Sequence, residues 1–190
     1  MEFAYEIQYL QAGTEELEAY LLSDDLFWPI HAAPPAGMQP YPRLTLGGLS
    51  LAQKRAGALI KSREEAWQVE QIIRRIDIAR QKWRLRWDDK AHRELMSRLM
   101  QWRNYLQEYR QDPVRHAAYY PYEVRWRVLI ELLEKNVEAV SENENKLRTG
   151  LDLILKSVFK PGEFVWDKEL QPAFAEDAYW YLYGRPRTGN

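Results

Sequence analysis

The feature that most constrains the fold is a run of 49 residues, 63–111, that contains neither glycine nor proline. These two residues interrupt helices, because proline lacks an amide hydrogen and glycine has too much conformational freedom. Ser62 and Glu65 stand three residues apart at the start of the run, which is the signature of a helix capping box. We therefore predict a long helical segment over 63–111.

A second stretch, 121–159, has the same character. Pro121 suits a first helical position, and Gly150 is the one residue inside the stretch that weakens a helix. Its apolar residues recur at the spacing of one helix face. We predict a mainly α fold in which the segments 63–111 and 121–159 run roughly antiparallel.

Shorter helices and two irregular regions are expected around these segments. Residues 24–43 hold five of the ten prolines, and their large apolar side chains favour an ordered loop pinned to the helices. The aromatic C-terminal tail is expected to pack on the helices, with residues 184–190 frayed. Alternating apolar residues over 3–9 are typical of a strand, which would pair with 163–167, but a helix fits 3–9 nearly as well and both alternatives stay open. We expect one helical domain of residues 1–190.

Residues 80–90 combine Trp83 and Trp87 with five basic residues. On a helical wheel both tryptophans share a face with three aliphatic residues that precede them, which is the pattern of a buried face. The apolar face of the residues that follow is rotated by about 90°, which predicts a kink near residue 88.

A basic stripe flanks this tryptophan face. From Arg74 to Arg103 there are ten Lys or Arg against four Asp or Glu. Basic side chains often lay their stems on apolar surface and keep their charges in water, so we interpret the stripe as a solvated face. Binding of nucleic acid or an acidic partner is the alternative, and pairing with a glutamate stripe of a second copy is another. The basic stripe consists of Arg75, Lys82, Arg86 and Arg93, and the glutamate stripe of Glu131, Glu134, Glu138 and Glu142.

The 24–43 loop offers a second candidate binding surface at Phe27 and Trp28. We favour a loop that covers the helical core with these aromatic rings. An exposed aromatic hook for another chain is the alternative.

The sequence lacks the residues that several kinds of chemical site require. There is no cysteine, which excludes thiolate metal sites, iron–sulfur clusters and a cysteine nucleophile. No two of the three histidines have metal-ligand spacing, and Asp89 with His92 is interpreted as a surface pair. The sequence contains no nucleophile elbow, phosphate-binding loop or dinucleotide fingerprint. These absences favour a non-enzymatic chain without metal or cofactor.

Charge and hydropathy bear on location. The net charge is −1, so no global attraction to nucleic acid or anionic membrane is expected. No stretch approaches about 18 uncharged apolar residues, and the first residues do not resemble a secretory signal. We expect a cytoplasmic protein without membrane contact.

Function is the least constrained property. Helical runs that are too long for their own chain to cover leave apolar surface for partners. Our hypothesis is a non-enzymatic interaction or scaffold protein that acts through protein–protein contact, with a homodimer as one version. The alternatives are a nucleic-acid-binding accessory protein that uses the basic stripe, and an enzyme with an unrecognised pocket under the 24–43 loop.

Overall fold

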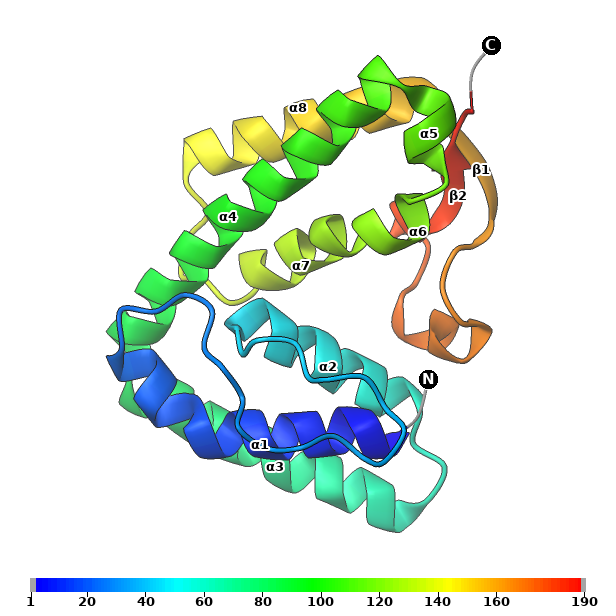
Figure 1. Ribbon diagram of the computed structural model, residues 1–190. Coiled ribbons are helices and arrows are strands. Elements are labelled where there is room, and N and C mark those ends of the chain that lie inside the picture. The colour runs from blue at the N-terminus through cyan, green and yellow to red at the C-terminus, as the bar shows by residue number, and fades with distance from the viewer. Residues whose placement is uncertain (1–2, 189–190) are drawn as a thin grey trace. The chain divides into compact units, whose positions relative to one another are not determined.

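The computed structural model describes residues 3–188 (Figure 1). Over this range the chain forms eight α-helices and one two-stranded antiparallel sheet, which confirms the mainly α class. The chain divides into two compact units, Met1–Glu94 and Leu95–Asn190, called the first and second unit below. The expectation of a single domain over 1–190 stays a prediction.

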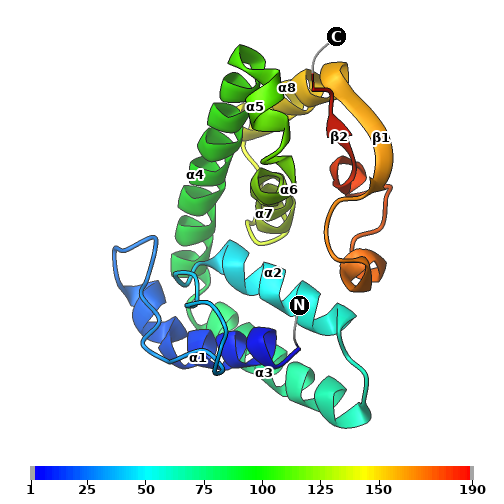
Figure 2. The same ribbon diagram turned by 45° about the vertical axis from the view of Figure 1, so that its right-hand side comes forward.

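The first unit is built on three helices and the first turns of a fourth. These are α1 (Phe3–Leu22), α2 (Leu46–Ala58), α3 (Arg63–Lys82) and the start of α4 (Arg84–Gln111). Helix α1 packs against both α2 and α3, as Figures 1 and 2 show from two sides. The core between them is mostly aliphatic and includes Leu10, Leu17, Leu21, Leu46, Leu49, Ala56, Ile72 and Ile76.

Residues 3–9 belong to α1, so the predicted strand over 3–9 is wrong. Tyr9 and Leu10 are neighbours in sequence and both are buried. A strand with one wet face buries only alternate residues, whereas a helix can bury two adjacent ones. The helix continues through Gly13, where a Cβ atom would lie 2.9 Å from Leu49 Cδ2. Glycine at this position lets α1 and α2 approach closely.

Two buried charges at the start of α4 fix the ends of α1 and α2. Lys90 Nζ donates to the carbonyl oxygens of Ser23 at 3.0 Å and Asp25 at 2.6 Å, just beyond the C-terminus of α1. Glu94 accepts a hydrogen bond of 2.8 Å from the amide of Gly47 at the start of α2. Each charge is opposite in sign to the partial charge of the helix end beside it, so its interaction with the helix dipole is favourable. Residues one turn apart on α4 thus position two helices.

The 24–43 loop is irregular but pinned, as predicted. Trp28 and Leu44 form an isolated antiparallel bridge with N–O distances of 3.1 and 2.7 Å. The ring of Tyr41 lies 5.1 Å from that of Tyr5 and 5.6 Å from that of Tyr9, both on α1. The loop therefore covers α1 with aromatic side chains.

The segment 63–111 consists of two helices that meet at Trp83. Ser62 and Glu65 form the predicted capping box at the start of α3. Trp83 leaves the helical conformation with φ −116° and ψ 36°. The break therefore lies before the predicted kink near 88, which falls inside α4. The apolar faces of α3 and α4 point in different directions, and the break lets each face pack against its own neighbours.

The second unit holds the rest of α4 and four further helices. These are α5 (Pro113–Ala117), α6 (Tyr120–Glu123), α7 (Arg125–Glu134) and α8 (Glu142–Val158). Its core combines aliphatic and aromatic side chains and includes Leu99, Trp102, Leu106, Tyr120, Val128, Ile130, Leu133, Leu151 and Leu155.

Residues 121–159 are mainly helical, as predicted, but they form separate helices instead of one continuous segment. The loop 135–141 separates α7 from α8. Asn136 Nδ2 donates at 2.8 Å to a carbonyl oxygen in the last turn of α7. Ser141 and Glu144 form a second capping box at the start of α8. These polar side chains satisfy the backbone groups at both helix ends, and no glycine or proline is needed.

The tail folds onto the second unit. Strand β1 (Phe159–Phe164) pairs antiparallel with β2 (Tyr183–Pro186), and the short 3-10 helices η1 (Lys168–Ala173) and η2 (Trp180–Leu182) lie between them. The sheet partner of the 163–167 region is therefore β2, and the predicted pairing with 3–9 is wrong. The predicted frayed end 184–190 is wrong for 184–186, which lie in β2, and residues 189–190 lie outside the described range.

Aromatic contacts hold the tail, which confirms its predicted packing. Tyr120 on α6 donates its hydroxyl hydrogen to the carbonyl oxygen of Tyr181. Trp166 Nε1 donates to the carbonyl oxygen of Pro121 at 2.8 Å. The ring of Phe174 meets that of Trp166 at 5.3 Å in an edge-to-face arrangement. Such pairs add stability beyond the apolar area that they bury.

Candidate functional site

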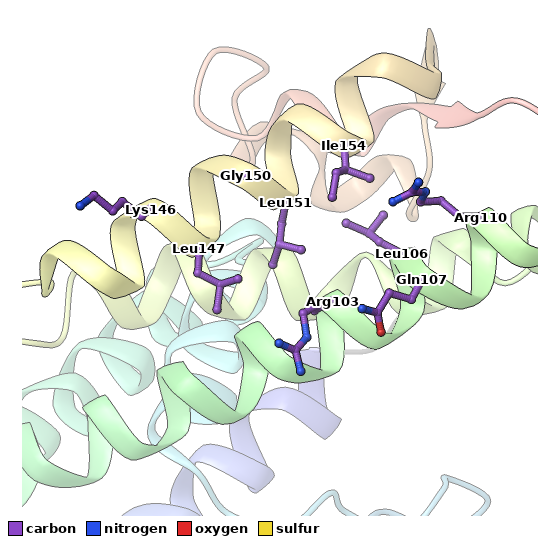
Figure 3. Close-up of a pocket in the computed structure, with 9 residues that line it drawn as sticks. All are labelled: Arg103, Leu106, Gln107, Arg110, Lys146, Leu147, Gly150, Leu151 and Ile154. Atoms are coloured by element: carbon purple, nitrogen blue, oxygen red, sulfur yellow. The ribbon is translucent and has the colours of Figure 1, made fainter.

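A groove of about 270 Å³ runs between α4 and α8 in the second unit (Figure 3). We call it the α4–α8 groove. Figure 3 shows Leu147, Leu151 and Ile154 pointing from α8 toward α4, and Leu106 pointing back toward α8. These four side chains make an apolar floor, in which Leu106 and Leu151 are buried and Leu147 and Ile154 are half-buried. The full lining is Arg103, Leu106, Gln107 and Arg110 from α4 with Lys146, Leu147, Gly150, Leu151 and Ile154 from α8.

Buried ion pairs fix the inner side of α8. Arg127 on α7 holds Asp152 with two hydrogen bonds, Nε–Oδ1 of 2.7 Å and Nη2–Oδ2 of 3.0 Å. Arg148 Nε lies 2.7 Å from Glu134 Oε1. Burial raises the pKa of Glu134, although Arg148 acts to lower it. Asp152 stands about 200° around the helix from Gly150, so this clamp turns the Gly150 side of α8 toward the groove.

The rim of the groove is cationic. Arg103, Arg110 and Lys146 line it, and none of its nine lining residues is acidic. Lys146 pairs with Glu142 one turn earlier on α8. Arg103 and Arg110 are exposed, and neither forms an ion pair with another residue of the described range. Among the described residues, the groove therefore presents two positive charges without an ion-pair partner beside an apolar floor.

Gly150 leaves open space in the wall of the groove. A Cβ atom built at this position meets no other atom within 4 Å. Glycine inside a helix costs roughly 0.5–1 kcal/mol relative to alanine. Packing within the described residues does not require glycine here.

The predicted basic stripe lies in the first unit on two helices, with Arg75 and Lys82 on α3 and Arg86 and Arg93 on α4. Lys82 Nζ is 2.9 Å from Glu18 of α1, and Arg93 donates at 2.8 Å to the carbonyl oxygen of Asp24. Arg75 and Arg86 are exposed and make no ion pair with another described residue. Two of the four side chains thus have structural contacts, and the helix break separates the two pairs.

The two aromatic candidates of the loop differ. Trp28 is half-buried and its Nε1 donates to Glu16 at 2.6 Å. Partial burial acts to raise the pKa of Glu16, but the hydrogen bonds from Trp28 and His31 lower it overall. Phe27 is exposed. These contacts favour Trp28 as part of the loop's attachment to α1, and nothing in the described residues tests a role of Phe27 in binding.

The sequence predicts no groove here; of the lining residues, Gly150 stands out in the sequence as a weak point in a helix and Arg103 as the end of a basic stretch. The spacing of Arg103 and Arg110, seven residues apart, was available as a signal of one helix side. The sequence predicts that the segments 63–111 and 121–159 run roughly antiparallel, but not which part or which face of the second segment lies beside these arginines. Helical periodicity reports which face of a helix is buried, but not which other helix covers it.

Residues 3–188 lack two further kinds of site. No three His, Cys, Asp or Glu side chains there come together in a way that would hold a metal ion. No helix in that range combines the length and the apolar character needed to cross a bilayer.

Comparison with protein-family models, with curated proteins and with solved structures yields no match to this chain. The chemistry of the α4–α8 groove therefore carries the functional argument.

Proposed function

We propose that this chain is an interaction protein that binds a segment of another protein in the α4–α8 groove. The observation that carries the proposal is an apolar floor of four aliphatic side chains beside the unpaired cations Arg103 and Arg110. Apolar contact supplies affinity in such grooves, while charges at the rim select the partner.

The shape of the groove favours a helical segment over a small molecule. All nine lining residues come from two helices, so no third element closes the groove. Small-molecule sites usually bury most of the ligand surface. An amphipathic helix suits an open groove between two helices, because its apolar face is covered while its polar face stays in water.

The lining favours binding over catalysis. It contains aliphatic side chains, one amide and three cations, and it has no carboxylate, imidazole or hydroxyl group to move a proton. The alternative of an enzyme with a pocket under the 24–43 loop draws no support from this groove, since that loop contributes none of its lining.

A second copy of the chain is a less suitable occupant than a different protein. Three of the four members of the glutamate stripe are occupied within their own unit: Glu131 accepts from Arg127, Glu134 pairs with Arg148, and Glu142 pairs with Lys146. A second copy would have to break these pairs to offer the stripe to Arg103 and Arg110.

The absence of cysteine makes a site-specific test direct. A Gln107→Cys variant carries a photo-crosslinker in the groove, and an Asn104→Cys variant carries it on an exposed position of α4 outside the lining. In an extract of cells that express the protein, we expect a crosslinked protein from position 107 and not from 104. Adding Gly150→Leu fills the groove and should abolish the product.

Equal crosslinking from both positions, a product that persists with Gly150→Leu, or no product at all would each overturn the proposal. Thermal unfolding followed by circular dichroism confirms that Gly150→Leu is folded. Leucine is a good helix former, and its Cβ atom at this position would meet nothing within 4 Å.

A further inference from the structure

We infer that the segment taken by the α4–α8 groove is an acidic amphipathic helix with two carboxylates seven residues apart and a large apolar anchor between them. The inference rests on the proposed function of the groove. It follows from three local features, namely the spacing of the unpaired arginines, the apolar floor between them and the open space at Gly150.

The spacing of the arginines sets the spacing of the carboxylates. Arg103 and Arg110 are seven residues apart on α4, which places their Cα atoms about 10.5 Å apart along the helix axis. A partner helix that lies along α4 advances by the same rise per residue. Acidic residues at its positions p and p+7 therefore reach both arginines together, whereas acidic residues three or four apart reach only one.

The apolar floor of the groove determines which side chains the partner helix carries between its two carboxylates. Leu106 lies between the two arginines on α4, and Leu147 and Leu151 face it from α8 (Figure 3). On the partner helix, positions p+3 and p+4 point to the same side as p and p+7. Large apolar side chains at these positions rest on the floor, so the partner has the pattern of an amphipathic helix.

Gly150 receives the largest of these side chains. It is the one place in the lining without a side chain, and a Cβ atom there would meet nothing within 4 Å. A leucine, phenylalanine or tryptophan at p+3 or p+4 would fill this space as a knob fills a hole. Gly150 is therefore the residue that determines the size of the anchor.

Lys146 plays a smaller part in this recognition. Its ammonium group already pairs with Glu142, and both side chains are well exposed. The pairing with a partner is thus expected mainly from Arg103 and Arg110, whose charges no described carboxylate compensates. This gives a specific expectation for single substitutions on the rim.

The test is a selection from displayed helices. The library contains helical peptides of about 18 residues, long enough to hold helical structure, randomised at positions p, p+3, p+4 and p+7. Selection uses the full chain, with counter-selection on the folded Gly150→Leu variant. We expect joint enrichment of Asp or Glu at p and p+7, with large apolar residues at p+3 or p+4.

Affinities of the selected peptides provide the second measurement. Arg103→Gln and Arg110→Gln should each weaken binding about two- to fivefold, as exposed ion pairs do. Gly150→Leu should weaken it about tenfold or more, because it removes the anchor site. The matched control is Arg115→Gln, an exposed arginine of α5 outside the groove, which should leave the affinity unchanged.

The outcomes separate this inference from the proposed function. Selected peptides without the acidic pair, with a different acidic spacing, or with equal sensitivity to Arg115→Gln would overturn the inference. If crosslinking from position 107 still depends on Gly150, the proposed function stands without it. If no peptide prefers the wild type over Gly150→Leu and no crosslink forms, both fail.

Discussion

Buried charges among the described residues are compensated in different ways, by opposite charges or by backbone groups. Arg127 and Asp152 share two hydrogen bonds, and Lys90 is satisfied by two carbonyl oxygens. Glu6 on α1 is less well compensated, because it is buried and its nearest cation, Arg55 Nη1, lies 3.7 Å away. Burial raises the pKa of Glu6 to about 7, although Arg55 acts to lower it.

Glu6 should make the protein less stable as the pH rises. The pKa of its carboxyl is raised from 4.5 to about 7 on folding, so the folded state holds a proton between these values that the unfolded state has lost. The free energy of unfolding should therefore fall between pH 4.5 and 7 by up to about 3 kcal/mol from this group. Urea unfolding at pH 5 and pH 8 measures it.

Glu6→Gln should remove this part of the pH dependence. The matched control is Glu15→Gln, an exposed position on the same helix, which should retain the pH dependence of the wild type. Identical curves for wild type and Glu6→Gln would show that Glu6 has no raised pKa in the folded protein.

Trp83 and Trp87 are predicted from the sequence to be equally buried, but the structure separates them. Trp87 is 3% exposed, whereas Trp83 ends α3 and is half-buried. Trp87→Ala should cost about 3–5 kcal/mol of stability, as large-to-small core substitutions do. Trp83→Ala should cost about 1 kcal/mol, the central value for single substitutions. Chemical denaturation of both variants tests this, and equal losses would contradict it.

At the scale of elements, α8 has two sides with different roles. One side carries Asp152 and Arg148, which pair with α7 and fix the rotation of the helix. The other carries Leu147, Gly150 and Ile154, which line the groove. A single glycine in the second set weakens the helix without a packing reason inside the described chain.

Gly150→Ala should stabilise the protein by about 0.5–1 kcal/mol, because alanine has the higher helix propensity and its methyl group meets nothing within 4 Å. The midpoint of urea unfolding, at unchanged slope, measures the gain. A loss of stability would mean that the wall at Gly150 is closed, and the anchor argument would then lose its basis.

The basic stripe on α3 and α4 belongs to the alternative in which the protein binds nucleic acid. Lys82 and Arg93 already have partners in the first unit, so we expect no binding to duplex DNA tighter than about 100 µM at physiological salt. Fluorescence anisotropy with a labelled duplex measures this. Submicromolar binding that weakens steeply with salt, and is lost when Arg75, Lys82, Arg86 and Arg93 are all replaced by glutamine, would favour the alternative.

At the scale of the whole molecule, the sequence predicts what local chemistry decides. The mainly α class, the capping box at Ser62, the pinned loop 24–43 and the packed aromatic tail all follow from residue types and spacing. The break at 135–141 also has a local signal in the sequence, because Ser141 and Glu144 repeat the capping-box pattern. A prediction based on glycine and proline alone does not find this break. The groove was not predictable, because it depends on which face of α8 turns toward α4.

The observed helices of 121–159 and the ion pairs of the glutamate stripe change the expected oligomeric state. The homodimer hypothesis rested on two helical runs too long for one chain to cover, and the second run is in fact three shorter helices. The glutamates that were to pair with basic residues of another copy are engaged within the second unit, as Glu131 with Arg127 and Glu134 with Arg148 show. We therefore expect light scattering to give the mass of one chain across the micromolar range. A mass of two chains that falls to one with Gly150→Leu would instead place a second copy in the groove.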